Sequence, residues 1–293
     1  MPFPLIAGTV REARGNTMAR ARRKATSNHL DTERDEMAYD GFRVERDEGR
    51  ALARITLDVP GKFNRVSMPA RDELRRVFEE LDADDSVRFV VMAGAGGAFT
   101  AGGDIPGFLE RSAWHVSRLA DNVAAPERCS KPVIAALQGF CFGVGLELAL
   151  ACDFRIAADD TQLAFPEVTI GMIPGSGGTQ RLARLVGLGR AKDIVMRGRR
   201  VHAEEALALG LVTEVVPGDE LDAAVARLVE ELSRHSPLAL AMAKRVLNHA
   251  YSGPLPLGLE LEGLAYGLLQ QSHDFREGVE AFTEKRKPEF EGR

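Results

Sequence analysis

Cysteine and aromatic residues are scarce in this chain, and neither sign of charge dominates it. Of the 293 residues, three are Cys and 6% are aromatic, and 38 Lys and Arg against 43 Asp and Glu leave a net charge of -5. Three Cys without a Cys-x-x-Cys pair exclude a disulfide framework and favour a reducing, cytoplasmic compartment. Because the chain is not basic as a whole, no nucleic-acid partner is expected for it.

Common signatures of metal, phosphate and nucleophile sites are also missing. The six His show no metal-ligand spacing, so no metal site is expected. No Gly-x-x-x-x-Gly-Lys-Ser/Thr sequence is present, and the GLGRAK segment at 187–192 lacks the third glycine of a dinucleotide loop. The PGSGG segment at 174–178 has Pro174 where a nucleophile elbow has glycine, so Ser176 is not expected to be a nucleophile.

One apolar run, at 132–152, is long enough to cross a bilayer. It contains Gln138, Glu147 and three glycines, and Asp153 follows it. A carboxylate in the middle of a membrane is costly, and the glycines suit a turn between a strand and a helix. The run therefore predicts buried core, and no membrane partner is expected.

The first 37 residues differ from the rest of the chain. They hold seven Lys and Arg and five acidic residues, with the basic residues gathered at 11–24 and no apolar periodicity. This pattern predicts an N-terminal extension over 1–37, either flexible or a docked arm. Two alternatives stay open: an organelle targeting segment, and a true start at Met18 or Met37.

From residue 39 onwards, strand and helix patterns alternate. Strands are predicted at 51–57, 88–94, 132–139, 153–158 and 211–216, and apolar stripes predict helices at 72–81 and 219–233. After residue 216 the chain looks helical to its end. These patterns predict an α/β fold, with a catalytic core at 38–216 and a helical region at 217–293.

Three glycine-rich segments, at 93–105, 139–153 and 165–182, attract attention, and the first two directly follow predicted strands. Glycines at such turns let the backbone bend sharply and leave N–H groups free, and a following helix adds a positive dipole. Two such turns facing each other would make a two-donor oxyanion hole. The alternative is that they are only tight connections.

Two carboxylates accompany these segments. Glu147 lies in the otherwise apolar LELALAC, and Glu167 follows Pro166 between Phe165 and Val168. An ionised carboxylate buried without a partner is very costly, so both are expected at an internal site. A pair of carboxylates in apolar surroundings suits general acid–base catalysis.

At these residues the chain resembles the enoyl-CoA hydratase/isomerase, or crotonase, superfamily. The matching segments are AFTAGGDI, KPVIAALQGFCFGVGLELALACDFRIA, FPEVTIGMIPGSGGTQRL and REGVEAFTEKRKPEF, which with the pattern between them cover about 40–290. The resemblance implies a crotonase-like spiral of ββα units with a C-terminal helical oligomerisation region. It also implies a homotrimer or a dimer of trimers.

The resemblance implies a role for each matching residue. Gly103 and Val144 would donate the two oxyanion N–H groups, Glu147 would activate water towards Cβ, and Glu167 would supply a proton at Cα. Gly175 would lie beside the reacting carbons. The remaining positions implied to contact the substrate or its coenzyme A are Lys62, Phe63, Ala101, Gly103, Asp104, Ile105 and, from a neighbouring subunit, Phe282 and Lys285.

The expected function is therefore hydration of a 2-enoyl-CoA to a 3-hydroxyacyl-CoA, with an acyl-CoA thioester as partner and no separate cofactor. The alternatives are another reaction of the superfamily, such as enoyl-CoA isomerisation or acyl-CoA hydrolysis, RNA binding through the basic cluster, and a non-catalytic scaffold. The segment at 106–128 is expected where relatives build the acyl pocket. Phe108, Leu109 and Trp114 either line that pocket or only pack.

Overall fold

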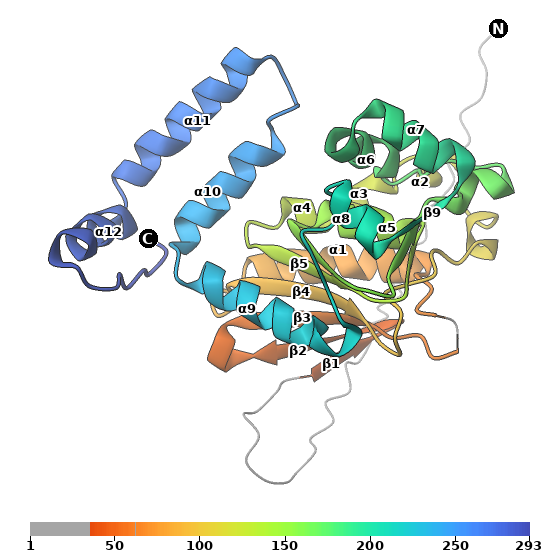
Figure 1. The fold of residues 1–293 in the computed structure, drawn as a ribbon, viewed down its shortest axis with the longest axis horizontal. Helices are drawn as coiled ribbons and strands as arrows, with labels where there is room; N and C mark the ends of the chain where they lie inside the picture. Colours follow the sequence, from red (N-terminus) through yellow and green to blue (C-terminus); the bar gives the residue numbers. More distant parts are fainter. Residues whose placement is uncertain (1–35, 62) are drawn as a thin grey trace, which may run out of the picture.

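The fold is built on two β-sheets, described here from a computed structural model that covers residues 36–61 and 63–293 (Figure 1). The larger sheet has seven strands in the order β1-β2-β3-β4-β5-β7-β10, and the smaller has the order β6-β8-β9. Pairing is antiparallel from β1 to β3 and parallel from β3 to β10. The strands of the larger sheet are β1 (Glu36–Tyr39), β2 (Phe42–Asp47), β3 (Leu52–Leu57), β4 (Phe89–Gly94), β5 (Val133–Leu137), β7 (Phe154–Ala158) and β10 (Glu214–Val216).

From β5 to β8, consecutive strands alternate between the two sheets. The chain passes from β5 into β6 (Phe140–Phe142) of the smaller sheet and then into helix α5 (Val144–Ala151). It next passes from β7 into β8 (Gln162–Ala164) and on towards helix α6 (Gly178–Val186). These repeated strand–strand–helix units are the ββα spiral that the resemblance predicts.

Both faces of the large sheet are covered, which is why its central strands are continuously apolar rather than alternating. One face packs on a core to which α1 (Met68–Asp82) and α5 contribute. The opposite face packs under α9 (Leu221–Ser233) through a second apolar cluster. The remaining elements of the body are α2 (Ala113–Val116), α3 (Ala120–Val123), α4 (Ala125–Arg128), α7 (Leu188–Arg197), β9 (Arg200–His202) and α8 (Ala203–Ala208).

The five predicted strands are present, although the last shortens from 211–216 to β10. The structure adds β1, which begins at Glu36, two residues before the expected start of the core at 38. This strand lies at the sheet edge, has only four residues and buries none of them, so its pattern is too short and too weak to predict a strand. The rest of the expected extension, residues 1–35, lies outside the described residues.

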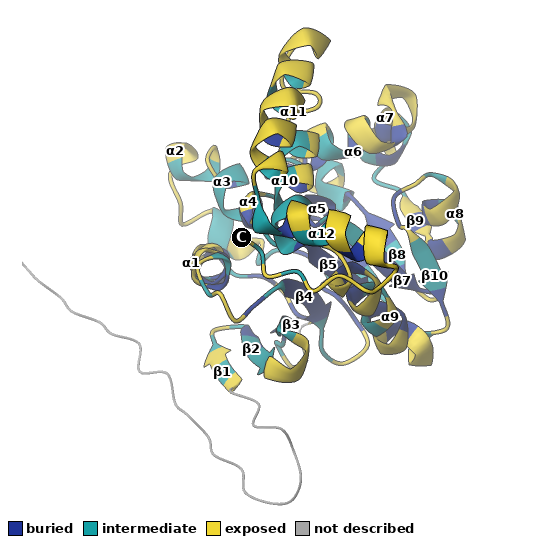
Figure 2. Ribbon diagram, turned by 90° about the vertical axis from the view of Figure 1, so that its left-hand side faces the viewer, coloured by how far each residue is buried: buried dark blue, intermediate teal, exposed yellow. Residues whose placement is uncertain are grey.

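The expected helical region at 217–293 divides into two parts. Helix α9 belongs to the layers of the core, whereas α10 (Pro237–Asn248), α11 (Leu255–Gln270) and α12 (His273–Glu284) extend to one side of the body, on the left in Figure 1. Most of α11 is exposed (Figure 2). None of the described helices is long and apolar enough to cross a membrane.

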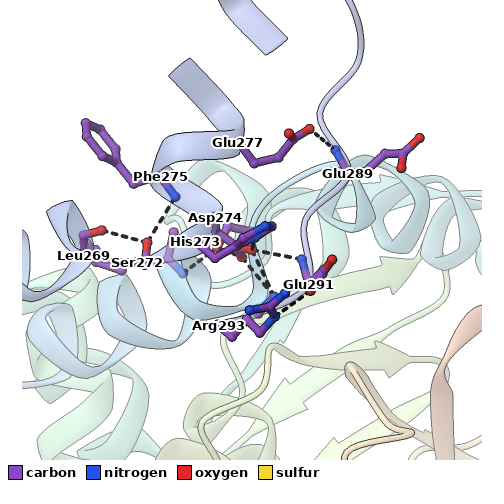
Figure 3. A network of polar contacts seen from close by, with 12 residues as sticks. Leu269, Ser272, His273, Asp274, Phe275, Glu277, Glu289, Glu291 and Arg293 are labelled. Atoms are coloured by element: carbon purple, nitrogen blue, oxygen red, sulfur yellow. Dashed lines mark hydrogen bonds and ion pairs between the residues drawn. The ribbon is translucent and has the colours of Figure 1, made fainter. Parts of the chain in front are cut away.

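Polar contacts fix the end of the chain onto α12. The Asp274 carboxylate accepts hydrogen bonds from the Ser236 hydroxyl (2.5 Å) and from the backbone N–H groups of Glu291 (2.9 Å) and Gly292 (3.0 Å). Nearby, the Glu277 carboxylate accepts from the Glu289 N–H at 2.7 Å (Figure 3). The tail thus folds back over α12 and towards the start of α10.

Candidate active site

The two glycine-rich turns predicted to face each other lie side by side. After β4 the chain runs parallel to β6, where Thr100 pairs with Cys141. The Thr100 N–H donates to the Phe140 carbonyl (2.8 Å), and the Phe142 N–H donates to the Thr100 carbonyl (3.0 Å). The turns that follow these segments, at 102–103 and 143–144, are therefore neighbours in space.

Each turn presents one free N–H group. Around Gly103, the Val66 N–H donates to the Gly102 carbonyl and the Asp104 N–H donates to the Val66 carbonyl, so the Gly103 N–H points away from Val66. Val144 is the first residue of α5, where an N–H has no acceptor within the helix. Across residues 36–61 and 63–293, neither N–H donates to a protein acceptor. Both can therefore bind an oxyanion.

Gly143 makes room for the second carboxylate. Its φ of 53° and ψ of -122° place it in a conformation that is essentially restricted to glycine. A Cβ built on it would lie 3.0 Å from Glu167 Oε1. The glycine thus lets the Glu167 carboxylate lie directly beside the turn that carries the Val144 N–H.

Glu147 is held by backbone N–H groups rather than by a cation. It is 3% exposed in the first turn of α5. Its Oε1 accepts hydrogen bonds from the N–H of Ser176 (2.6 Å) and of Gly178 (3.1 Å), at the start of α6. Such charge-assisted bonds stabilise an ionised carboxylate and fix its direction. The PGSGG segment therefore positions a carboxylate through its backbone.

Glu167 is held differently. It lies in the short 3-10 helix Pro166–Ile170, and its Oε2 is buried with no hydrogen-bond partner among the described residues. Burial raises its pKa from 4.5 to about 7, the Glu147 charge also raises it, and Arg71 opposes the rise. A carboxyl group with this pKa can give and take a proton near neutral pH.

Arg71 is a site residue that the sequence reasoning missed. This arginine of α1 is 3% exposed, and its Nη2 would lie 2.7 Å from a Cβ built on Gly103. Burial lowers its pKa, whereas the charges of Glu147 and Glu167 raise it. A signal was available, because Arg71 stands three residues before Leu74 and so continues the apolar stripe of the predicted helix.

The other predicted residues of the coenzyme side lie along the first turn. Lys62 lies outside the described residues, while Phe63 is exposed and packs edge-on against Phe140 at 5.6 Å between ring centroids. The Ala101 N–H donates to the Phe63 carbonyl at 2.8 Å. Asp104 and the exposed Ile105 continue from Gly103, and Gly175 precedes Ser176 in the loop that holds Glu147.

Two of the predicted site residues do not lie near Glu147 and Glu167 of the same chain. Phe282 and Lys285 are exposed at the end of α12, which Figure 1 shows at the opposite end of the molecule from α6 and α7. Of the three candidate wall residues, Phe108 contacts the site, whereas Leu109 and Trp114 are exposed. No group of three or more His, Cys, Asp or Glu in the described part of the chain is placed to hold a metal ion.

Comparison with known proteins fits this geometry. The sequence profile of the enoyl-CoA hydratase/isomerase family matches residues 47–293. The chain belongs to this family. It is 38% identical over 249 residues to a putative enoyl-CoA hydratase/isomerase of Bacillus subtilis, covering 82% of this chain and 95% of that protein. It is 36% identical over 259 residues to a crotonyl-CoA hydratase of Syntrophomonas wolfei, covering 87% of this chain and 99% of that protein.

Solved structures of family members share the fold. A crystal structure of an enoyl-CoA hydratase subunit I from Geobacillus kaustophilus superposes with a TM-score of 0.82 at 35% identity, covering 86% of this chain and 98% of that one. A putative enoyl-CoA hydratase from Streptomyces coelicolor also gives a TM-score of 0.82 at 35% identity, covering 92% and 98%. This family member is therefore an enzyme of acyl-CoA chemistry with the crotonase fold.

Proposed function

We propose that this enzyme hydrates a 2-enoyl-CoA to a 3-hydroxyacyl-CoA, using Glu147, Glu167 and the N–H groups of Gly103 and Val144. The observation that carries the proposal is the convergence of two differently held carboxylates beside two free N–H groups. The hydratase names of the Syntrophomonas wolfei relative and of other family members support hydration over isomerisation or thioester hydrolysis.

The thioester oxygen is the group that the two N–H donors bind. As water adds to Cβ, negative charge moves onto this oxygen and gives it enolate character. A donor that meets developing charge in this way is typically worth about 2.7–4 kcal/mol. The two turns therefore lower the barrier without a change in their own structure.

The two carboxylates divide the proton transfers. The Glu147 carboxylate, directed by two backbone N–H groups, accepts a proton from water as the water oxygen bonds to Cβ. Glu167, whose pKa of about 7 keeps much of it protonated near neutral pH, delivers a proton to Cα. One water is consumed, and the substrate double bond becomes a C–O and a C–H bond.

The binding of coenzyme A and the assembly are part of the same proposal. Coenzyme A lies along Lys62, Phe63 and Ala101, and Phe282 and Lys285 of a neighbouring subunit complete its site. The enzyme is a homotrimer or a dimer of trimers and needs no separate cofactor. The three buried free cysteines suit the cytoplasm.

Hydration is tested by incubating the protein with crotonyl-CoA and following the loss of the conjugated enoyl absorbance. Glu147→Gln and Glu167→Gln should each lower kcat by about 10²–10⁴-fold while still binding CoA, and the exposed Glu79→Gln serves as a matched control with unchanged activity. Full activity in either glutamate variant refutes its assigned role. Release of free thiol, or conversion of a 3-enoyl-CoA without any hydration, would indicate hydrolysis or isomerisation instead.

A further inference from the structure

Arg71 is a buried cation at the reaction site, and the proposed hydration assigns none of its N–H donors to the substrate. It is 3% exposed, and its Nε is buried without a hydrogen-bond partner. Among residues 36–61 and 63–293 its side chain has no hydrogen bond or salt bridge, and Nε is its fully buried unpaired atom. A guanidinium has five N–H donors, and buried polar groups almost always have partners. A partner for Arg71 is therefore expected from a ligand.

The guanidinium lies at the reacting end of the substrate site. Its Nη2 is close to Gly103, whose N–H is one of the two oxyanion donors. Its central carbon lies 5.2 Å from the ring centroid of Phe108, in the segment expected to form the acyl pocket. Arg71 is thus placed between the thioester position and the acyl wall.

The two catalytic carboxylates do not form ion pairs with Arg71. The charges of Glu147 and Glu167 both act on it, yet neither glutamate forms an ion pair with it. Glu147 Oε1 is instead bound by two backbone N–H groups, and Glu167 Oε2 has no partner among the described residues. The donors of the guanidinium are therefore not taken up by either glutamate.

Gly103 and Phe108 pack against the Arg71 guanidinium. A Cβ on Gly103 would lie 2.7 Å from Arg71 Nη2 and 3.3 Å from Phe108 Cε2, so the glycine leaves the space that the guanidinium and the ring occupy. The Phe108 ring supports the guanidinium by a cation–π contact. These contacts orient the group without using its N–H donors.

A neutral acyl chain would cover this cation without pairing it, which is unfavourable for a buried charge. A carboxylate would instead match the two parallel N–H groups that a guanidinium offers. We propose that the enzyme selects acyl-CoA substrates whose short acyl chain ends in a carboxylate, and that Arg71 binds this carboxylate. The proposal rests on the acyl-CoA function above and names its substrate class.

The kinetic test compares two substrates of equal chain length, trans-glutaconyl-CoA and trans-2-pentenoyl-CoA. The wild-type enzyme should favour the carboxylated substrate by about tenfold or more in kcat/KM, as expected for a hydrogen-bonded charge pair. Arg71→Met should abolish this preference, and Arg71→Lys should keep part of it. Arg75→Met, on the exposed face of the same helix, is the matched control and should keep the wild-type ratio.

A binding test does not depend on catalysis. Glutaryl-CoA should bind more tightly than valeryl-CoA, or succinyl-CoA more tightly than butyryl-CoA, by calorimetry with the wild-type protein, and Arg71→Met should remove the difference. If both pairs bind equally and glutaconyl-CoA has no kinetic advantage, the inference is overturned even when crotonyl-CoA is hydrated. If no enoyl-CoA is hydrated but the carboxylated thioesters bind more tightly, the proposed hydration fails and the role of Arg71 stands.

Discussion

Glu167 makes the proposed chemistry sensitive to pH. Burial raises its pKa to about 7, and its protonated form is the one that delivers a proton to Cα. We therefore expect kcat/KM for crotonyl-CoA to fall as the pH rises through about 7, the pKa of Glu167. Because Arg71 lowers this pKa, Arg71→Met should move the alkaline limb to higher pH. A profile that stays flat across this range in the wild-type enzyme would contradict the assignment.

The same raised pKa has a consequence for stability. The folded protein keeps a proton on Glu167 that the unfolded chain releases above 4.5, so the folded state loses stability as the pH rises from 4.5 to beyond about 7. Glu167→Gln should remove this loss and stabilise the protein by about 1–2 kcal/mol at pH 8, discounted for partial exposure. At pH 5 it should change little. Calorimetric Tm values of both proteins at the two pH values measure the effect, and an equal shift at both would contradict this origin.

Gly143 shows how a glycine can affect catalysis through the space that it leaves for a neighbouring carboxylate. In Gly143→Ala the new Cβ would lie 3.0 Å from Glu167 Oε1, at a φ of 53° that side chains rarely adopt. We expect a loss of about 1–2 kcal/mol of stability and a fall in kcat of about 10²-fold, since the general acid is displaced. Gly189→Ala in α7 is the control, because nothing lies near its Cβ and alanine favours a helix. Wild-type kcat in Gly143→Ala would show that the site tolerates the methyl group.

At the scale of elements, the apolar strands of the larger sheet were predictable and the strands of the smaller sheet were not. Strands β3, β4, β5 and β7 fall where runs of buried residues predict them. The strands of the smaller sheet have three residues each, too few for a period to appear, and their pairing depends on contacts distant in sequence. The two glutamates were found because a charge in an apolar run is visible in the sequence. Arg71 was missed because other arginines lie near it in α1, and its position on the apolar stripe of the helix was overlooked.

Helix α10 is joined to the core by a buried lysine. Lys244 Nζ lies 2.7 Å from Asp153 Oδ2 and donates to the carbonyl groups of Pro126 (2.8 Å) and Lys131 (3.0 Å). Lys244→Met should leave the Asp153 carboxylate without its cation and cost about 3–5 kcal/mol, the usual result of breaking a buried pair from one side. Urea unfolding followed by circular dichroism measures the loss, with the exposed Arg245→Met as the control. Recovery of stability in the double variant Lys244→Met/Asp153→Leu would identify the unpaired charge as the cause.

At the scale of the whole molecule, the arm formed by α10, α11 and α12 exposes much apolar surface. Helix α11 buries only Ala265; Leu261 and Leu269 are half-buried, and six large apolar side chains are exposed. They are Leu255, Leu257, Leu259, Leu264, Tyr266 and Leu268. Exposed apolar surface of this kind is typical of an interface, as the proposed assembly expects. The arm also carries Phe282 and Lys285, which the proposed coenzyme site takes from a neighbouring subunit.

These two features lead to a linked prediction for assembly and activity. The wild-type protein should sediment at three or six times the chain mass of 31.8 kDa, and Leu264→Glu/Leu268→Glu, which places two charges one turn apart on α11, should shift it to lighter species. The same variant should raise KM for the acyl-CoA far more than it lowers kcat, because the glutamates and the oxyanion N–H groups stay intact while the neighbour's contacts are lost. Leu207→Glu on α8 is the control, an exposed leucine away from the arm. Dissociation with unchanged KM would show that each subunit binds coenzyme A on its own, whereas an unchanged mass would place the interface elsewhere.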